Sequence, residues 1–125
     1  MRVALPTLKA LLLDNVVEVK FPRRRIKEGY AATRRMLCTN SPTLLNSTDG
    51  RNVLGFTPTV GVKVPNPETY NLLVTWDLFK RDFRQINMNN CDLITQMPAD
   101  QDWWLYYYEK ISKMTAGEIE SFYNT

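Results

Sequence analysis

The hydrophobic and polar positions change period along the chain, and each period predicts an element. Four leucines recur at helical spacing around Pro6, namely Leu5, Leu8, Leu11 and Leu12. This spacing predicts a short helix over about residues 6–13, closed by Asn15 in a left-handed conformation. Residues 16–21 then alternate between apolar and polar side chains, which predicts a half-buried strand that Pro22 ends.

Later segments continue the strand pattern and are separated by short turns. The predicted strands are 32–40, 72–77, 83–88 and 91–97, with turns at 79–82 and at Asn89 and Asn90. Five short strands behind a helix predict a mainly β fold with flanking α elements. The expected architecture is a small five-stranded barrel of the Sm-like or SH3-like type.

The segment from 40 to 69 differs in composition, because it is rich in Asn, Ser, Thr, Pro and Gly. Long connections are uncommon in compact domains. The segment is therefore either a functional loop or an insertion pinned by apolar side chains, and the sequence leaves both open. The pinning residues would be Val53, Phe56, Val60, Val62 and Val64.

Two helices are predicted at the end of the chain. The stretch 100–114 carries aspartates at its start and lysines near its end, which suits the helix macrodipole. Thr115 and Glu118 have the spacing of a capping box, which predicts a second helix over 116–123. We therefore expect a barrel unit with its N-terminal helix over 1–97 and a C-terminal helical extension over 98–125.

The length of 125 residues fits one domain, and the composition excludes several chemistries. There is no histidine, and Cys38 and Cys91 are far apart, so they are expected to be buried free thiols rather than metal ligands. Histidine-dependent nucleophilic schemes are excluded, and the glycines fit no phosphate-binding loop. We therefore expect no enzyme, no metal and no cofactor. The leucine run is interrupted by Lys9 and is too short to span a bilayer, so an intracellular protein without a membrane partner is expected.

Charge is unevenly distributed. The segment 20–35 holds seven basic residues against Glu28, whereas residues 92–125 hold six acids against Lys110 and Lys113. Arginine-rich segments are typical of phosphate-contacting surfaces. The predicted nucleic-acid-binding residues are Arg23, Arg24, Arg25, Lys27, Arg34, Arg35 and Arg84. Two alternatives stay open: the basic segment is a solvated or internally paired loop, and Arg84 pairs with Asp77 or Asp82 to fix its hairpin.

The block WWLYYY has more aromatic bulk than one helix face can bury. Trp104 and Tyr107 are expected on the barrel, which leaves Trp103, Tyr106 and Tyr108 as candidate contacts for a protein partner. Simple packing of the helix over the barrel is the alternative.

Three segments carry a resemblance to a known family. They are the leucine-rich helix and strand from Leu8 to Phe21, RRMLCTN (Arg34 to Asn40), and TWDLFKRDFRQINMNNCDLI (Thr75 to Ile94). In these segments the chain resembles small phage-encoded proteins with a WYL-like, Sm-like SH3 β-barrel fold. Members of that family commonly show an aromatic residue followed by arginine in the second strand of the later hairpin, and here these positions are Phe83 and Arg84.

The resemblance implies a phage origin and a β-barrel, and the wider groups suggest nucleic-acid sensing and transcription control. The first hypothesis is a non-enzymatic phage accessory protein that binds nucleic acid, a host or viral protein, or both, in viral transcription or host takeover. The second is a protein-only interaction module, either a virion component or an inhibitor of a host protein. The expected location is the host cytoplasm or the virion, and homo-oligomers through edge strands are compatible with the pattern.

Overall fold

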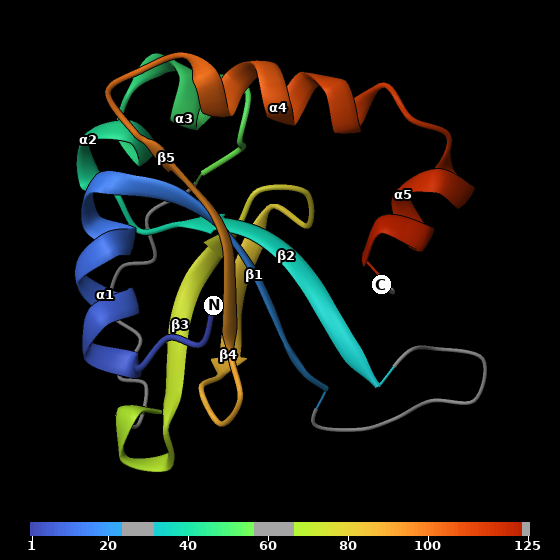
Figure 1. The fold of residues 1–125 in the computed structure, drawn as a ribbon. Helices are drawn as coiled ribbons and strands as arrows, with labels where there is room; N and C mark the ends of the chain where they lie inside the picture. Colours follow the sequence, from blue (N-terminus) through green and yellow to red (C-terminus); the bar gives the residue numbers. More distant parts are fainter. Residues whose placement is uncertain (24–31, 57–66, 124–125) are drawn as a thin grey trace.

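The computed structural model describes residues 1–23, 32–56 and 67–123 (Figure 1). Five antiparallel strands follow an N-terminal helix, α1 (Leu5–Asp14). The strands are β1 (Asn15–Pro22), β2 (Thr33–Thr39), β3 (Leu72–Asp77), β4 (Asp82–Asn87) and β5 (Asp92–Pro98). They form one sheet in the order β4-β3-β2-β1-β5. The predicted helix and five strands are thus confirmed, with ends that differ by one or two residues.

The sheet consists of two parts that share little pairing. β1 pairs with both β2 and β5 along most of its length, and β3 pairs with β4. The two parts join where Cys38 and Thr39 lie opposite Asp77 and Trp76. Among the described strands β4 and β5 remain the two edges, so the sheet is open and the predicted barrel closure is not seen.

The sheet buries a separate apolar cluster on each face, because its strands alternate apolar side chains on both sides. We call the cluster under α1 the inner core: it includes Leu8, Leu12, Val17, Val19, Phe21, Met36, Cys38, Leu73, Ile86 and Met88. The outer core lies on the other face and includes Val16, Leu37, Leu44, Leu54, Trp76, Leu78, Met97, Trp104 and Tyr108. Because both faces of the sheet are covered, polar residues of β1 and β2 are buried as well.

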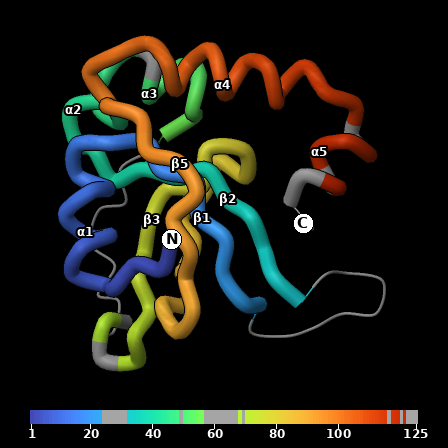
Figure 2. Tube along the Cα trace, in the orientation of Figure 1, coloured from blue at the N-terminus to red at the C-terminus, as the bar shows by residue number. Residues whose placement is uncertain are grey.

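Helices from two parts of the sequence contribute to the outer core. They are α2 (Pro42–Leu45) and α3 (Thr48–Asn52) in the middle of the chain, and α4 (Trp103–Ser112) near its end. Figure 1 shows α4 running across one end of the sheet, with α2 and α3 beside its start. α5 (Ala116–Tyr123) follows α4 and contacts β2. The tube in Figure 2 shows that the described ends of β1 and β2 extend away from α1, α2 and α3.

The segment 40–56 contains short helices, which the prediction of a loop or insertion did not include. Ser41 caps α2, because its Oγ accepts a hydrogen bond from Leu44 N at 3.2 Å, and Pro42 occupies the first helical position. Val53 and Phe56 pack against the outer core, as predicted for pinning residues. Val60, Val62 and Val64 lie outside the described residues. A short 3₁₀ helix, η1 (Pro67–Tyr70), then leads into β3.

Local signals at the helix ends were predicted with mixed success. Asn15 was expected in a left-handed conformation, but its φ is −136° and it starts β1 directly. Its side chain ends the helix instead, since Asn15 Nδ2 donates to Leu11 O at 2.9 Å. The capping box is confirmed: Glu118 N donates to Thr115 Oγ1 at 3.2 Å, and Thr115 N donates to Glu118 Oε1 at 3.3 Å.

Candidate functional site

The basic hairpin of β1 and β2 places two neighbouring arginines on opposite faces of the sheet. Arg34 lies opposite Phe21 and therefore faces the inner core, whereas Arg35 lies opposite Lys20 and faces the outer core. Each guanidinium meets a carboxylate that is fully buried. The base of the hairpin is thus held by an ion pair on each side.

On the inner face the buried carboxylate is Asp77, at the end of β3. Its Oδ2 lies 3.3 Å from Arg34 Nη2 and 3.6 Å from Arg84 Nε. Its Oδ1 accepts from the backbone amides of Phe79 and Lys80 at 3.1 and 3.2 Å, which shapes the turn into β4. Burial raises the pKa of the Asp77 carboxyl, and the two amides and two guanidinium groups act in the opposite direction.

On the outer face the buried carboxylate is Glu18, in the middle of β1. Arg35 Nε donates to Glu18 Oε1, and the hydroxyl of Tyr107 donates to Glu18 Oε2. Burial and the adjacent carboxylate raise the pKa of Tyr107 to about 12, so this phenol stays protonated as a donor at neutral pH. The two hydrogen bonds to Glu18 join β2 and α4 to β1 at the root of the basic hairpin.

The predicted nucleic-acid residues therefore divide into two groups. The side chains of Arg34, Arg35 and Arg84 are 13%, 28% and 39% exposed, and all three pair with buried carboxylates. The alternative in which Arg84 pairs with Asp77 is confirmed. Arg23 is half-buried and directly follows β1, where its backbone amide donates to Ala32 O at 2.9 Å. Arg24, Arg25 and Lys27 lie outside the described residues.

Phe83 and Arg84, which the resemblance places together, point to opposite faces of β4. Phe83 lies opposite Trp76 on the outer face, and its ring meets those of Trp76 and Phe56 edge to face, with centroids 5.0 and 6.1 Å apart. Arg84 lies opposite Thr75 on the inner face. The two residues do not form one binding site, because one belongs to an aromatic cluster and the other to an ion-pair cluster.

The aromatic helix α4 exposes part of the predicted protein-docking surface. Trp103 and Tyr106 are 67% and 69% exposed and lie one turn apart. Tyr108, which was expected beside them, is buried and stacks on Phe79 with ring centroids 4.9 Å apart. Tyr108 is buried because Phe79, in the β3–β4 turn, reaches α4. The sequence pattern of α4 contains no information on this contact.

Both cysteines are buried free thiols, as predicted. Cys38 Sγ donates to Val17 O at 3.6 Å. Burial raises the pKa of Cys38 far above its usual value and that of Cys91 to about 11. Neither thiol is therefore a thiolate nucleophile at neutral pH.

In the part of the chain that the structure describes, no three histidine, cysteine, aspartate or glutamate side chains are arranged to hold a metal ion. None of the helices in this part of the chain is long and apolar enough to cross a membrane. By fold the chain is a small, mainly β protein with a five-stranded antiparallel sheet. Comparison with protein-family models, with curated proteins and with solved structures gave no match.

Proposed function

We propose that the chain is a non-enzymatic binding protein whose basic β1–β2 hairpin contacts the phosphate backbone of nucleic acid. The observation that carries the proposal is the anchoring of this hairpin by Arg34 and Arg35. These two arginines compensate Asp77 and Glu18 and so fix the hairpin root on both faces. A rigid root supports binding, because less conformational entropy is lost when a presented segment meets its ligand.

The remaining charge of the hairpin supports a phosphate ligand. Apart from Arg34 and Arg35, the segment 20–35 contains five basic residues against Glu28. They are Lys20, Arg23, Arg24, Arg25 and Lys27. Arginine and lysine at this density attract polyanions, and each neutralised phosphate releases counterions. Within this account Arg34, Arg35 and Arg84 hold the hairpin and its neighbours in place, and the contacts to phosphate come from the other basic residues.

We further propose that the open, curled sheet is an incompletely closed barrel of the Sm-like type, in a phage accessory protein that acts in transcription or host takeover. The N-terminal helix and the five antiparallel strands support the fold assignment. Contact between β1 and β4 also supports it, since β2 and β3 separate these strands in the sheet order and only a curled sheet brings them together. The phage role rests on the sequence resemblance.

Binding to single-stranded DNA, double-stranded DNA and RNA tests the proposal. The test variant is R23A/R24A/R25A, and the matched control is R51A/K110A/K113A, which removes the same charge from exposed sites on α3, on α4 and just after α4. At about 50 mM salt we expect the test variant to lose at least about tenfold in affinity and the control to lose less than about threefold. Equal losses, or no binding by the wild-type protein, would overturn the proposal.

A protein-only interaction module is the second candidate function, and the exposed pair Trp103 and Tyr106 favours it. Large aromatic side chains at the surface are enriched in protein interfaces. In this case a partner would copurify after nuclease treatment and would be lost from W103A/Y106A. Y70A is the matched control, because Tyr70 is an exposed aromatic residue on η1. A partner that the double variant retains would exclude α4 as its docking site.

A further inference from the structure

The C-terminal helix α5 lies against the strand that leads into the basic hairpin. Residues 113–115 join α5 to α4, and α5 contacts β2. In Figure 1 the helix lies beside the half of β2 that runs toward the hairpin. Arg34 and Arg35 belong to this half of the strand. A helix that follows the whole sheet in the sequence therefore occupies space next to the proposed phosphate-binding segment.

The charges of these two neighbours are opposite. The segment 114–125 contains Glu118 and Glu120 and has neither lysine nor arginine, whereas the segment 20–35 contains seven basic residues and one glutamate. Carboxylates beside a basic segment lower its positive potential and repel a phosphate backbone that approaches it. α5 and a nucleic acid are therefore competitors for the same basic segment.

The attachment of α5 is small. Among the side chains of α5 that the structure describes, Ile119 is half-buried and the others are exposed. The described hydrogen bonds of Glu118 are all to Thr115, so they stabilise the helix internally and do not fix it to the sheet.

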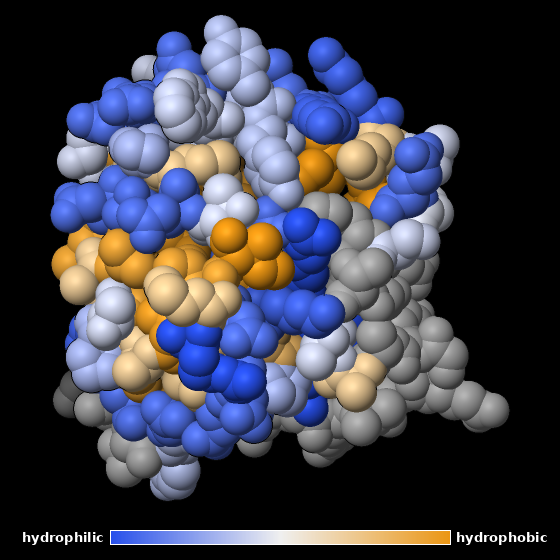
Figure 3. Space-filling model, in the orientation of Figure 1, coloured by the Kyte–Doolittle hydropathy of each residue, from blue (hydrophilic) through white to orange (hydrophobic). Residues whose placement is uncertain are grey.

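The junction of α5 with α4 is apolar. Ile111 is buried and Met114 is half-buried near the end of α4. Figure 3 shows apolar side chains between the end of α4 and α5. Elements with few buried contacts detach at a small cost in free energy, because little apolar surface becomes exposed. α5 therefore has the weak attachment that a displaceable element needs.

We propose that α5 is an autoinhibitory element of the basic hairpin and that nucleic acid displaces it from β2. This inference rests on the proposed phosphate-binding function. While α5 lies on β2, its carboxylates oppose the approach of phosphates. The observed affinity is the affinity of the open form multiplied by the fraction of molecules in which α5 is displaced. A change that weakens the contact between α5 and β2 therefore strengthens nucleic-acid binding.

The affinity of full-length variants for single-stranded and double-stranded DNA at about 50 mM salt tests this inference. The test variant is E118Q/E120Q, which removes both charges of α5, and glutamine at position 118 keeps the acceptor of the capping box. We expect this variant to bind at least about fivefold more tightly than the wild-type protein.

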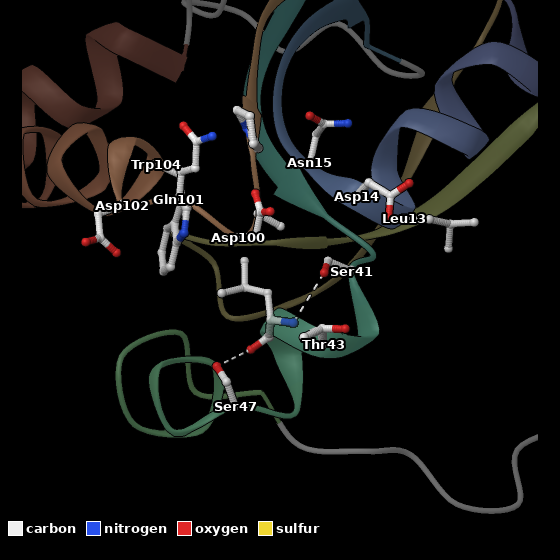
Figure 4. Close-up of a pocket in the computed structure, with 13 residues that line it drawn as sticks. Leu13, Asp14, Asn15, Ser41, Thr43, Ser47, Asp100, Gln101, Asp102 and Trp104 are labelled. Atoms are coloured by element: carbon white, nitrogen blue, oxygen red, sulfur yellow. Dashed lines mark hydrogen bonds between the residues drawn. The ribbon is translucent and has the colours of Figure 1, made fainter.

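The matched control is D100N/D102N, which also removes two exposed carboxylates. Asp100 and Asp102 lie near the start of α4, beside a cavity that α1 and α2 line and α5 does not (Figure 4). Because charges separated by more than a Debye length are screened, we expect the control to change affinity by less than about twofold. Thermal unfolding checks that both variants are folded.

Hydrogen exchange measured by mass spectrometry detects the displacement itself. The amides of 116–123 should exchange faster in the presence of saturating DNA, since a displaced helix loses its packing. A helix that stays on β2 would exchange at the same rate or more slowly when DNA binds.

The results distinguish this inference from the proposed function. If the wild-type protein binds DNA and the two variants change affinity equally, autoinhibition is overturned and hairpin binding stands. Exchange of α5 that is no faster with DNA bound also overturns autoinhibition alone. If the wild-type protein binds no nucleic acid, the proposed function falls and the inference falls with it.

Discussion

The phenol of Tyr107 donates a hydrogen bond to the buried carboxylate of Glu18, which lies 89 positions earlier in the chain. This contact joins α4 to the middle of β1, and Arg35 completes it from β2. A buried charge needs such partners, because an unpaired carboxylate in an apolar environment is strongly destabilising. The aromatic helix and the basic hairpin are therefore parts of one structural unit.

Removal of the Tyr107 hydroxyl should weaken this unit. Tyr107→Phe keeps the ring and deletes one donor to Glu18, so we expect the free energy of unfolding to fall by about 1 to 2 kcal/mol. Urea denaturation followed by circular dichroism measures the effect. Tyr106→Phe is the control, because Tyr106 is exposed on the same helix. Equal stability of the two variants would mean that the Glu18 contact contributes nothing.

The inner ion pair should make a larger contribution. Arg34→Met keeps the apolar stem but leaves buried Asp77 with Arg84, whose side chain is more exposed. We expect a loss of about 3 kcal/mol at pH 7, since removing the less exposed of its two arginine partners leaves the buried Asp77 carboxylate incompletely compensated. Arg51→Met on α3 is the exposed control and should change stability by less than about 0.5 kcal/mol. A loss in Arg34→Met as small as in the control would contradict the anchoring role.

The pKa of Asp77 predicts a pH dependence with a definite sign. Burial raises the folded-state pKa of Asp77 above the usual aspartate value of 3.8, so the folded protein binds this proton more tightly than the unfolded chain does. The stability that proton binding at Asp77 contributes is fully present below the pKa of this carboxyl in the unfolded chain. It is lost as pH rises through the pKa of the carboxyl in the folded protein. The stability advantage of the wild-type protein over Asp77→Asn should therefore shrink as pH rises above about 3.8. An advantage that grows with pH would show that the arginines outweigh desolvation.

Gly50 should be irreplaceable in the contact between α2 and α3. A Cβ at this position would lie 2.3 Å from both Leu44 O and Leu45 O, and these backbone atoms have little freedom to move. Gly50→Ala should lower the free energy of unfolding by about 2 kcal/mol or more. Gly117→Ala is the control, because a Cβ there meets no described atom within 4 Å. Thermal unfolding of both variants gives the comparison, and similar melting temperatures would refute the close approach.

Much of the fold was predictable because its signals are local. Period-2 alternation located β1 and β2, helical leucine spacing located α1, and Thr115 with Glu118 located the start of α5. By contrast α2 and α3 were missed, since their Asn, Ser, Thr and Gly content is typical of loops. The Ser41–Pro42 pair was the available signal, as serine at the cap and proline at the first helical position start many helices.

The candidate sites were less predictable because they depend on contacts distant in the sequence. Alternation correctly placed Glu18 on the face of the sheet that points away from the inner core. Its burial depends on α4, which packs over that outer face. Helical periodicity placed Tyr107 against the sheet, where it reaches Glu18, and left Tyr108 outside. Tyr108 is buried as well, because Phe79 stacks on it. A cavity of about 580 Å³ lies between the end of α1, residues 41–47 and the start of α4, so no single segment of the sequence contains its pattern.

The salt dependence of nucleic-acid affinity distinguishes a hairpin that contacts phosphates from one that does not. The dissociation constant is measured against salt concentration for the wild-type protein and for R23A/R24A/R25A. Affinity falls as salt rises, so the slope of log affinity against log salt is negative. If these arginines contact phosphates, the magnitude of this slope should be smaller by about 2 to 3 in the variant. Identical slopes for the two proteins would contradict a phosphate-binding role for the hairpin.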